Sequence, residues 1–186
     1  MNILVVYCHP SEESFCAKLA QACVRKLEAD GHTVVFRDLY KERFDPVLSE
    51  AEFSQYHTAL VGSSKIGAYC GDLAKVEGIL FVYPTWWYGM PATMKGYLDR
   101  VWLPGVAFEI DSSGSISTNA LRHVNRFMVV TTYGSPKWWI LLWLNNPARK
   151  AVERGLGRLF APGCKKAWLR CMTWTGIASA TARCFF

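Results

Sequence analysis

Short apolar runs, separated by stretches with helical spacing, recur along this chain and constrain its fold more than any other feature. The first run, residues 2–8, is apolar at nearly every position rather than at alternate positions. Such a run is typical of a central strand in a parallel sheet, which is buried on both faces. Residues 14–30 then show an amphipathic helical pattern, and Gly31 follows where a glycine commonly ends a helix. The start of the chain therefore predicts a strand followed by a helix.

The same alternation continues along the whole chain. Strands are predicted at residues 33–39, 78–83, 126–132 and 167–173, and helical segments within 40–75, at 91–101 and within 136–160. Ser49 is predicted to cap a short helix, and Asn145-Asn146-Pro147 to interrupt the last helical segment. We therefore predict an α/β fold: a doubly wound, flavodoxin-like parallel sheet of five strands in the order 2-1-3-4-5, with helices on both faces.

A length of 186 residues is enough for a single domain, residues 1–186, with a sizeable core. About ten residues follow the last predicted strand, and a doubly wound domain usually covers that sheet face with a final helix. We therefore expect this C-terminal helix to be missing or cut short.

Composition limits the classes of function. A hydrophobic fraction of 51% with 19% charged residues indicates a folded, soluble protein. The net charge of +6 suits an anionic partner, such as a phosphorylated cofactor or a membrane surface, but the basic residues are dispersed and form no nucleic-acid-binding module. The seven cysteines contain no CxxC pair and the four histidines are scattered, so we expect buried thiols, a cytoplasmic location and no metal site.

Ligands of doubly wound proteins bind at the carboxyl ends of the strands, where the strand order reverses. The loop after the first strand, residues 8–15, lacks the glycines of a P-loop or of a dinucleotide fingerprint. It does offer His9, Ser11, Ser14 and the amides of a helix start, which suit a phosphate group. On this loop alone, an ordinary helix cap at Ser14 and a packed His9 explain the residues equally well.

The loop after the third strand is the most unusual segment, because it places Trp86, Trp87 and Tyr88 side by side between two prolines. Apolar rings are usually buried in a core, whereas loops at this edge of the sheet bind ligands. Three adjacent rings, with Gly89 allowing close backbone approach, predict a site for a flat aromatic ligand. The alternative is a core plug beneath the next helix. The loop after the fourth strand, residues 131–136, adds hydroxyls and a glycine at the same crevice.

These loops carry motifs that resemble the NAD(P)H:quinone oxidoreductase family, the flavodoxin-2-type flavoproteins that include relatives of modulator of drug activity B. The motifs are His9-Pro10-x-x-x-Ser14-Phe15, Pro84-x-x-Trp87-x-Gly89-x-Pro91-Ala92-x-x-Lys95-Gly96 and Thr131-Thr132-x-Gly134. The resemblance implies a homodimer that binds FAD, or FMN in some relatives. It also implies two hydride transfers, from NAD(P)H as co-substrate to the flavin and from the flavin to a quinone or a similar aromatic acceptor.

The resemblance also implies roles for individual residues. His9, Ser14 and Phe15 would hold the phosphate and ribityl part, with Ser11 in the same loop. The isoalloxazine would lie against Pro84, Thr85, Trp86, Trp87 and Tyr88, joined by Thr131, Thr132, Tyr133 and Gly134. Residues 137–144 contain no histidine, whereas characterised relatives have a Tyr and a His there. We therefore carry over no acid–base pair, and Tyr133 is the one candidate catalytic residue.

A tryptophan-rich segment follows the third loop. Trp139 and Trp143 are spaced to share one helix face, while Trp138 points elsewhere. We expect these rings to fill a dimer interface and the core. The alternative is that they wall an apolar acceptor pocket or make a peripheral membrane contact.

The leading prediction is a flavin-dependent NAD(P)H:acceptor oxidoreductase that reduces quinones. FAD or FMN, and NADH or NADPH, stay open at this point. A regulatory, ancillary flavoprotein of a membrane transporter is the first alternative, and it would bind a membrane partner stoichiometrically. A flavodoxin-type electron carrier is the second alternative, but such carriers usually present acidic docking faces and this chain is basic.

Overall fold

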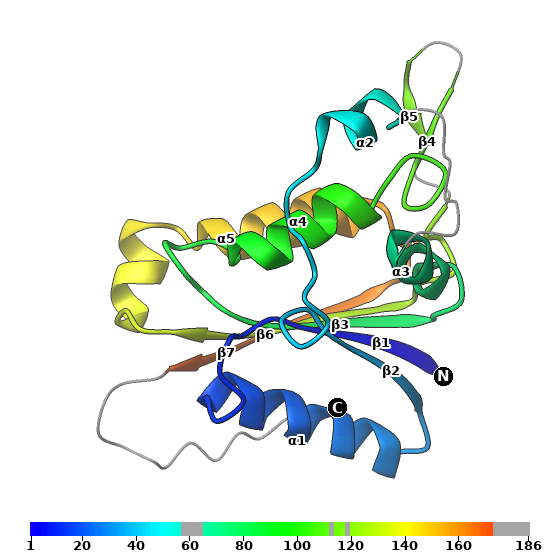
Figure 1. The fold of residues 1–186 in the computed structure, drawn as a ribbon. Coiled ribbons are helices and arrows are strands. Elements are labelled where there is room, and N and C mark those ends of the chain that lie inside the picture. Colours follow the sequence, from blue (N-terminus) through cyan, green and yellow to red (C-terminus); the bar gives the residue numbers. More distant parts are fainter. Residues whose placement is uncertain (57–64, 112–113, 118–119, 173–186) are drawn as a thin grey trace.

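The computed structural model of the chain describes residues 1–56, 65–111, 114–117 and 120–172. Five parallel strands form the central sheet in the order β2-β1-β3-β6-β7 (Figure 1). These strands are β1 (Asn2–Tyr7), β2 (Thr33–Asp38), β3 (Gly78–Pro84), β6 (Arg126–Tyr133) and β7 (Lys165–Met172). Among the strands of this sheet alone, the order is 2-1-3-4-5, which confirms the predicted flavodoxin-like topology.

Helices cover both faces of the sheet, as predicted. Helix α1 lies on one face, and α3 and α4 lie on the other (Figure 1). The helices are α1 (Phe15–Ala29), α2 (Glu50–Ser54), α3 (Lys65–Leu73), α4 (Ala92–Val101) and α5 (Pro147–Lys150). Shorter helical turns of other types are the π-helical η1 (Trp139–Trp143) and η2 (Ala151–Gly155) and the 3-10 turn η3 (Leu156–Arg158).

The predicted caps are present. The Ser14 hydroxyl accepts a hydrogen bond from the Ala17 amide at 3.0 Å and so satisfies an amide that the first turn of α1 leaves open. Ser49 and Glu52 form a reciprocal capping box at the start of α2. Gly31 follows α1 with φ +80°, a left-handed conformation that a side chain would disfavour.

Two features differ from the sequence-based prediction. A short antiparallel pair, β4 (Glu109–Ile110) and β5 (Ile116–Ser117), forms a separate two-stranded sheet that we did not predict. Two-residue strands carry too little alternation to be recognised in the sequence. Strand β7 begins at Lys165 rather than at residue 167, because an edge strand tolerates charged residues that hide its apolar pattern. The last predicted residue of this strand, Thr173, lies outside the described residues.

The helical stretch after β6 is interrupted where predicted. Asn145 and Asn146 have φ values of 55° and 48°, in the left-handed region, and Pro147 then begins α5. Asparagine is among the residues that enter this region most readily, and the residue before a proline disfavours the right-handed helix. The two asparagines therefore turn the chain between η1 and α5.

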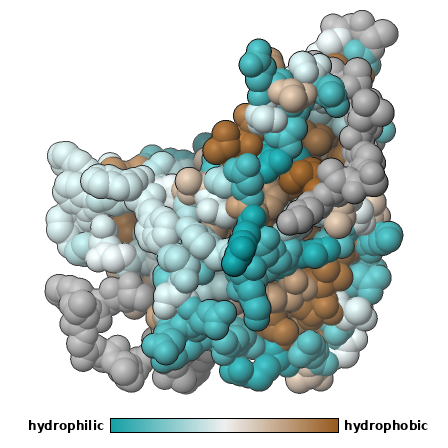
Figure 2. All heavy atoms as spheres, viewed as in Figure 1, coloured by the Kyte–Doolittle hydropathy of each residue, from teal (hydrophilic) through white to brown (hydrophobic). Residues whose placement is uncertain are grey.

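The core has one cluster on each face of the sheet. Gly96 shows how tightly α4 packs into the larger cluster, since a methyl group added there would overlap the backbone of Pro46. This contact gives a physical reason for the glycine of the Lys95-Gly96 motif. The predicted burial of thiols is confirmed for the described cysteines, of which five are buried and Cys164 is half-buried. On the face seen in Figure 2, hydrophilic residues cover much of the surface and hydrophobic atoms show between the α1 layer and the sheet.

Candidate functional site

The loops that follow β1, β3 and β6 meet at the carboxyl edge of the sheet. The Cys8 amide, just after β1, donates to the carbonyl oxygen of Val82 in β3 at 3.0 Å. The Thr85 amide, just after β3, donates to the carbonyl oxygen of Thr132 in β6 at 2.8 Å. These bonds extend the parallel ladder beyond the strand ends and bring together the three loops that the sequence predicted to share a crevice.

The aromatic loop is a closed turn. The Trp86 amide donates to the Gly89 carbonyl at 3.1 Å, and the Gly89 amide donates back to the Trp86 carbonyl at 3.0 Å. The two corner residues, Trp87 and Tyr88, have φ values of 49° and 61°. Positive φ at both corners is the pattern of a type I′ turn, which normally uses Asn and Gly. Large rings at these corners are strained, and such strain persists where the surrounding structure holds it.

The rings of this loop point away from the core. The exposed fraction is 96% for Trp87 and 41% for Trp86, while Tyr88 is half-buried. The alternative of a core plug is therefore wrong, because the turn directs its first two rings into solvent. Within the described part of the chain, the amides of Trp87 and Tyr88 donate no hydrogen bond. The loop thus presents aromatic faces together with two unused backbone donors.

A row of hydroxyl groups lies beside the aromatic loop. The Thr85 and Thr131 hydroxyl oxygens are 2.8 Å apart, which ties the loop after β3 to strand β6. Thr131 is fully buried and so can act on the crevice only through Thr85. A cavity of about 160 Å³ opens next to this pair and is lined by Thr85, Trp87, Tyr88, Tyr133 and Ser135. Two of the three predicted loops therefore share one recess.

Tyr133, the candidate catalytic residue, ends strand β6 at the base of this recess. Its ring is buried, and its hydroxyl donates to Oδ1 of Asn146 at 3.4 Å. Burial raises the pKa of the Tyr133 phenol, and a hydrogen bond with Thr85 partly offsets the rise. The phenol therefore stays protonated at neutral pH and can hold a proton. Among the remaining predicted positions in this region, Pro84 and Thr132 are buried and paired in register, and Gly134 is exposed.

The loop after β1 faces the aromatic loop. The centroids of the His9 and Trp86 rings are 6.2 Å apart. The Ser11 amide donates to Nδ1 of His9 at 3.0 Å, so this ring nitrogen is an acceptor and the imidazole is held by its own loop. Ser14 caps α1 and Phe15 begins it. The helix start points at the crevice edge, where its dipole favours an anion.

The sequence matches the Flavodoxin_2 family, described as having a flavodoxin-like fold, over residues 1–141. This segment contains all three loops of the crevice and every predicted site residue. The chain belongs to the Flavodoxin_2 family. The resemblance to NAD(P)H:quinone oxidoreductases is thereby confirmed at the level of family.

Two relatives of this family are informative. An uncharacterised NAD(P)H oxidoreductase of Haemophilus influenzae is 32% identical over 131 residues, which cover 70% of this chain and 64% of the relative. Ribosyldihydronicotinamide dehydrogenase [quinone] of Rattus norvegicus is 27% identical over 164 residues, which cover 80% of this chain and 70% of that enzyme. The chain therefore spans about two-thirds of the length of these relatives.

Solved structures of other proteins share this fold. A putative quinone reductase from Klebsiella pneumoniae has a TM-score of 0.74 and 25% identity, over 92% of this chain and 75% of its own. An FMN-dependent NADH-azoreductase from Bacillus anthracis, solved in complex with FMN, has a TM-score of 0.70 and 15% identity, over 92% of this chain and 86% of its own. The second likeness concerns the fold alone.

The tryptophan-rich segment follows the third loop of the crevice. Trp139 and Trp143 stack with centroids 5.7 Å apart and planes 17° apart, so the predicted shared face is confirmed. The expectation that the segment fills the core is wrong, because Trp138 and Trp143 are 60% and 73% exposed. Within the π-helical segment η1, Ile140 rather than an indole reaches the core. Trp139 Nε1 donates to the Tyr88 hydroxyl at 3.2 Å and so braces the aromatic loop.

Sequence reasoning missed the contribution of Asn146. Its side chain is buried and accepts from Tyr133, although we had treated Asn146 only as part of a helix break. A buried asparagine in an otherwise apolar surrounding needs a partner, but the sequence does not show which one. The described residues contain no cluster of three metal-ligating side chains and no helix long and apolar enough to span a membrane.

Proposed function

We propose that this protein is a flavin-dependent NAD(P)H:acceptor oxidoreductase that reduces quinones or similar aromatic acceptors. The observation that carries the proposal is the almost fully exposed ring of Trp87. It stands on a hydrogen-bonded turn beside a hydroxyl-lined recess, at the edge where doubly wound sheets bind ligands. The names of the Haemophilus and rat relatives support the same chemistry. A bound flavin would supply the hydride chemistry, while the protein binds and orients.

The residues of the recess fit a flavin ring. Trp87 and Trp86 offer π faces for stacking, and the unused amides of Trp87 and Tyr88 are donors for the heteroatoms of the ring. Thr131 orients the Thr85 hydroxyl through their 2.8 Å contact, so this hydroxyl is set before a ligand arrives. Thr132 and Gly134 belong to the same wall in this proposal. The aromatic loop forms one side of the recess through Trp87 and Tyr88.

Tyr133 is the buried phenol of this recess and can hold a proton. Its raised pKa keeps the phenol protonated, and Asn146 and Thr85 fix its position. Residues 137–144 contain no histidine that could form the second half of an acid–base pair. We therefore propose that Tyr133 orients and stabilises the reacting groups, and that protons are exchanged with solvent through the open side of the recess.

The loop after β1 suits the phosphate end. His9, Ser11, Ser14 and Phe15 lie at the start of α1, where the helix dipole favours negative charge. The carboxylates of Glu12 and Glu13 are exposed in the same loop, so backbone amides rather than side-chain charge would attract the phosphate. FMN needs this subsite alone, whereas FAD also needs a site for its adenosine. We therefore propose FMN as the first flavin to test, with FAD as its alternative; the FMN complex of the Bacillus neighbour supports this order.

The assembly and location of the protein are part of the same proposal. The exposed side chains of Trp138, Leu142 and Trp143 form an apolar ridge next to the recess, and we propose that a homodimer covers it. Peripheral contact with an anionic membrane is the alternative. Light scattering of the free protein tests for the dimer, and liposome co-sedimentation of the wild type and of Trp138→Ser tests for membrane binding. We propose a cytoplasmic, single-domain protein, because the reaction draws on NAD(P)H and the described thiols are mostly buried.

The deciding experiment is an absorption spectrum of the purified protein, followed by reconstitution with FMN and with FAD and mass identification of the released cofactor. We expect stoichiometric flavin, and NADH or NADPH oxidation that depends on a benzoquinone. If neither flavin is retained or taken up, the proposal is wrong. Flavin binding with slow turnover on every acceptor would instead identify a regulatory flavoprotein.

A further inference from the structure

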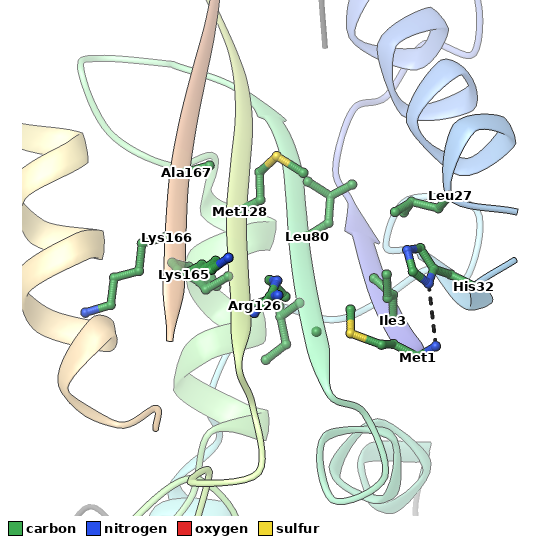
Figure 3. A pocket seen from close by; sticks show the side chains of 13 residues that line it. Met1, Ile3, Leu27, His32, Leu80, Arg126, Met128, Lys165, Lys166 and Ala167 are labelled. Carbon is green, nitrogen blue, oxygen red and sulfur yellow. Dashed lines mark hydrogen bonds between the residues drawn. The ribbon is translucent and has the colours of Figure 1, made fainter. Parts of the chain in front are cut away.

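A second recess lies at the opposite edge of the sheet from the proposed flavin site. It has a volume of about 360 Å³ and opens at the amino ends of the strands, on the face that α1 covers (Figure 3). This volume is within the range of small-molecule sites. None of the residues that line it belongs to the loops of the flavin site.

The floor of this recess is a continuous apolar row across three strands. Leu80 of β3 pairs in register with Met128 of β6, and Met128 pairs with Ala167 of β7. Ile3 of β1 and Leu27 of α1 form the other wall, as Figure 3 shows. Three neighbouring strands give an apolar run of about 10 Å at the spacing of about 4.8 Å between strands.

Two cations stand together at one end of this floor. Arg126 and Lys165 are register partners on β6 and β7, and both side chains are exposed. Like charges directly opposite each other destabilise a sheet. Within the described residues neither forms a salt bridge, and the Arg126 guanidinium reaches only the oxygens of Asn125.

Other charged groups at this edge do not neutralise the pair. The Glu77 carboxylate accepts from the Asn2 amide at 3.0 Å. The Lys166 ammonium points away from the recess and donates to the Gly157 carbonyl (Figure 3). His32 is turned toward the Met1 amine, 3.5 Å away. The recess therefore combines an apolar floor with a positively charged end, for which the described residues provide no counter-ion.

We propose that this recess binds a free medium-chain fatty acid anion. The carboxylate would lie between Arg126 and Lys165, because guanidinium and ammonium groups form strong charge-assisted hydrogen bonds with carboxylates. The tail would cover Leu80, Met128 and Ala167, and a row of this length matches roughly eight to ten carbons. Charge complementarity and the apolar row together favour this occupant over a purely polar anion, which would leave the floor uncovered.

The test is calorimetric titration of the full chain with decanoate below its micelle concentration, and with decanol as the neutral analogue. We expect saturable binding of one decanoate per chain and binding of decanol weaker by about tenfold or more, because decanol lacks the charge-assisted contacts. The double variant Arg126→Gln/Lys165→Gln should lose about tenfold in decanoate affinity. The matched control, Lys18→Gln/Arg25→Gln, makes the same change of net charge on exposed positions of α1 and should bind as the wild type does.

A third variant tests the apolar floor while both cations remain. Ala167→Phe, at an exposed position of the edge strand β7, fills the recess and should abolish decanoate binding while circular dichroism stays unchanged. No saturable binding to the wild type, or binding that survives both Ala167→Phe and the double variant, would overturn the proposal. Flavin uptake is measured on the same samples, so failure at this edge is distinguishable from failure of the proposed flavin site.

Discussion

The phenol of Tyr133 donates to the side-chain oxygen of Asn146 at 3.4 Å, and this contact joins the end of strand β6 to the break between η1 and α5. Asn146 and its neighbour Asn145 share a left-handed backbone, but only Asn146 is buried. Substitutions at these two positions can therefore distinguish the effect of backbone strain from the effect of the hydrogen bond.

Replacing each asparagine by glycine should have opposite effects. Asn145→Gly relieves a left-handed conformation at an exposed site, and we expect the free energy of unfolding to rise by about 0.5 kcal/mol. Asn146→Gly also relieves strain but removes the acceptor of Tyr133, and we expect a net loss of about 1 kcal/mol. Urea denaturation of both variants measures this. Changes of the same sign would show that the Tyr133 contact contributes little.

Trp87 offers a similar separation of stability from binding. Trp87→Gly and Trp87→Ala both remove the stacking ring, and we expect either to weaken flavin binding by about tenfold. Only glycine relieves the left-handed corner of the turn, so Trp87→Gly should be more stable than Trp87→Ala by about 1 kcal/mol. Flavin fluorescence titration and urea denaturation provide the two readouts. Full flavin occupancy of both variants at ordinary dilution would contradict a stacking role.

The hydroxyl pair of Thr85 and Thr131 can be tested by a double-mutant cycle. Each single change to valine leaves a polar partner unsatisfied and should cost about 1–2 kcal/mol of unfolding free energy. In the double variant both partners are gone, so we expect a loss smaller than the sum by about 1 kcal/mol. Additive losses would mean that the two hydroxyls, 2.8 Å apart, do not stabilise each other.

The tight packing of α4 predicts a sharp contrast between two helical glycines. A methyl group at Gly96 overlaps the backbone of Pro46, so Gly96→Ala should lower the free energy of unfolding by about 3 kcal/mol. A methyl group at Gly71 of α3 meets nothing within 4 Å, so Gly71→Ala should raise it by about 0.5 kcal/mol. Thermal melts of both variants check this. Equal tolerance at the two sites would disprove the close approach of Pro46.

Buried thiols should make the protein sensitive to alkali. Burial raises the pKa of Cys8 and of Cys16 from 9.0 to about 12. The unfolded thiols ionise above pH 9 while the folded ones stay protonated, so their stabilising effect is complete below pH 9 and is lost as the pH rises toward 12. At pH 10 each thiol lowers the unfolding free energy by about 1.4 kcal/mol relative to pH 8.

The check is urea denaturation under reducing conditions at pH 8 and pH 10. The double variant Cys8→Ala/Cys16→Ala should lose about 3 kcal/mol less over this interval than the wild type, because its two thiols no longer titrate. An identical loss in both proteins would show that other groups cause the alkaline sensitivity.

The strands and their order were predictable because each central strand is a continuous apolar run of strand length, and these runs alternate with segments of helical spacing. The crevice loops were predictable because the strands are parallel, so that every loop that follows a strand lies at the carboxyl edge of the sheet. The contact of Tyr133 with Asn146 was not, because it depends on the turn at Asn145. Nor was the exposure of Trp138 and Trp143, because the sequence does not show that Ile140 is the residue of η1 that reaches the core. Local winding leaves no periodic trace in so short a segment.

The turn from Trp86 to Gly89 is closed by its own two hydrogen bonds before any ligand is present. The ordering of its rings is therefore completed during folding, and a ligand that stacks there meets a preorganised surface. The strain at Trp87 and Tyr88 is carried by the folded chain at all times. Folding and recognition are thus thermodynamically linked in this loop. The strained turn lowers the stability of the free protein, and in return the loop loses less conformational entropy when a ligand binds.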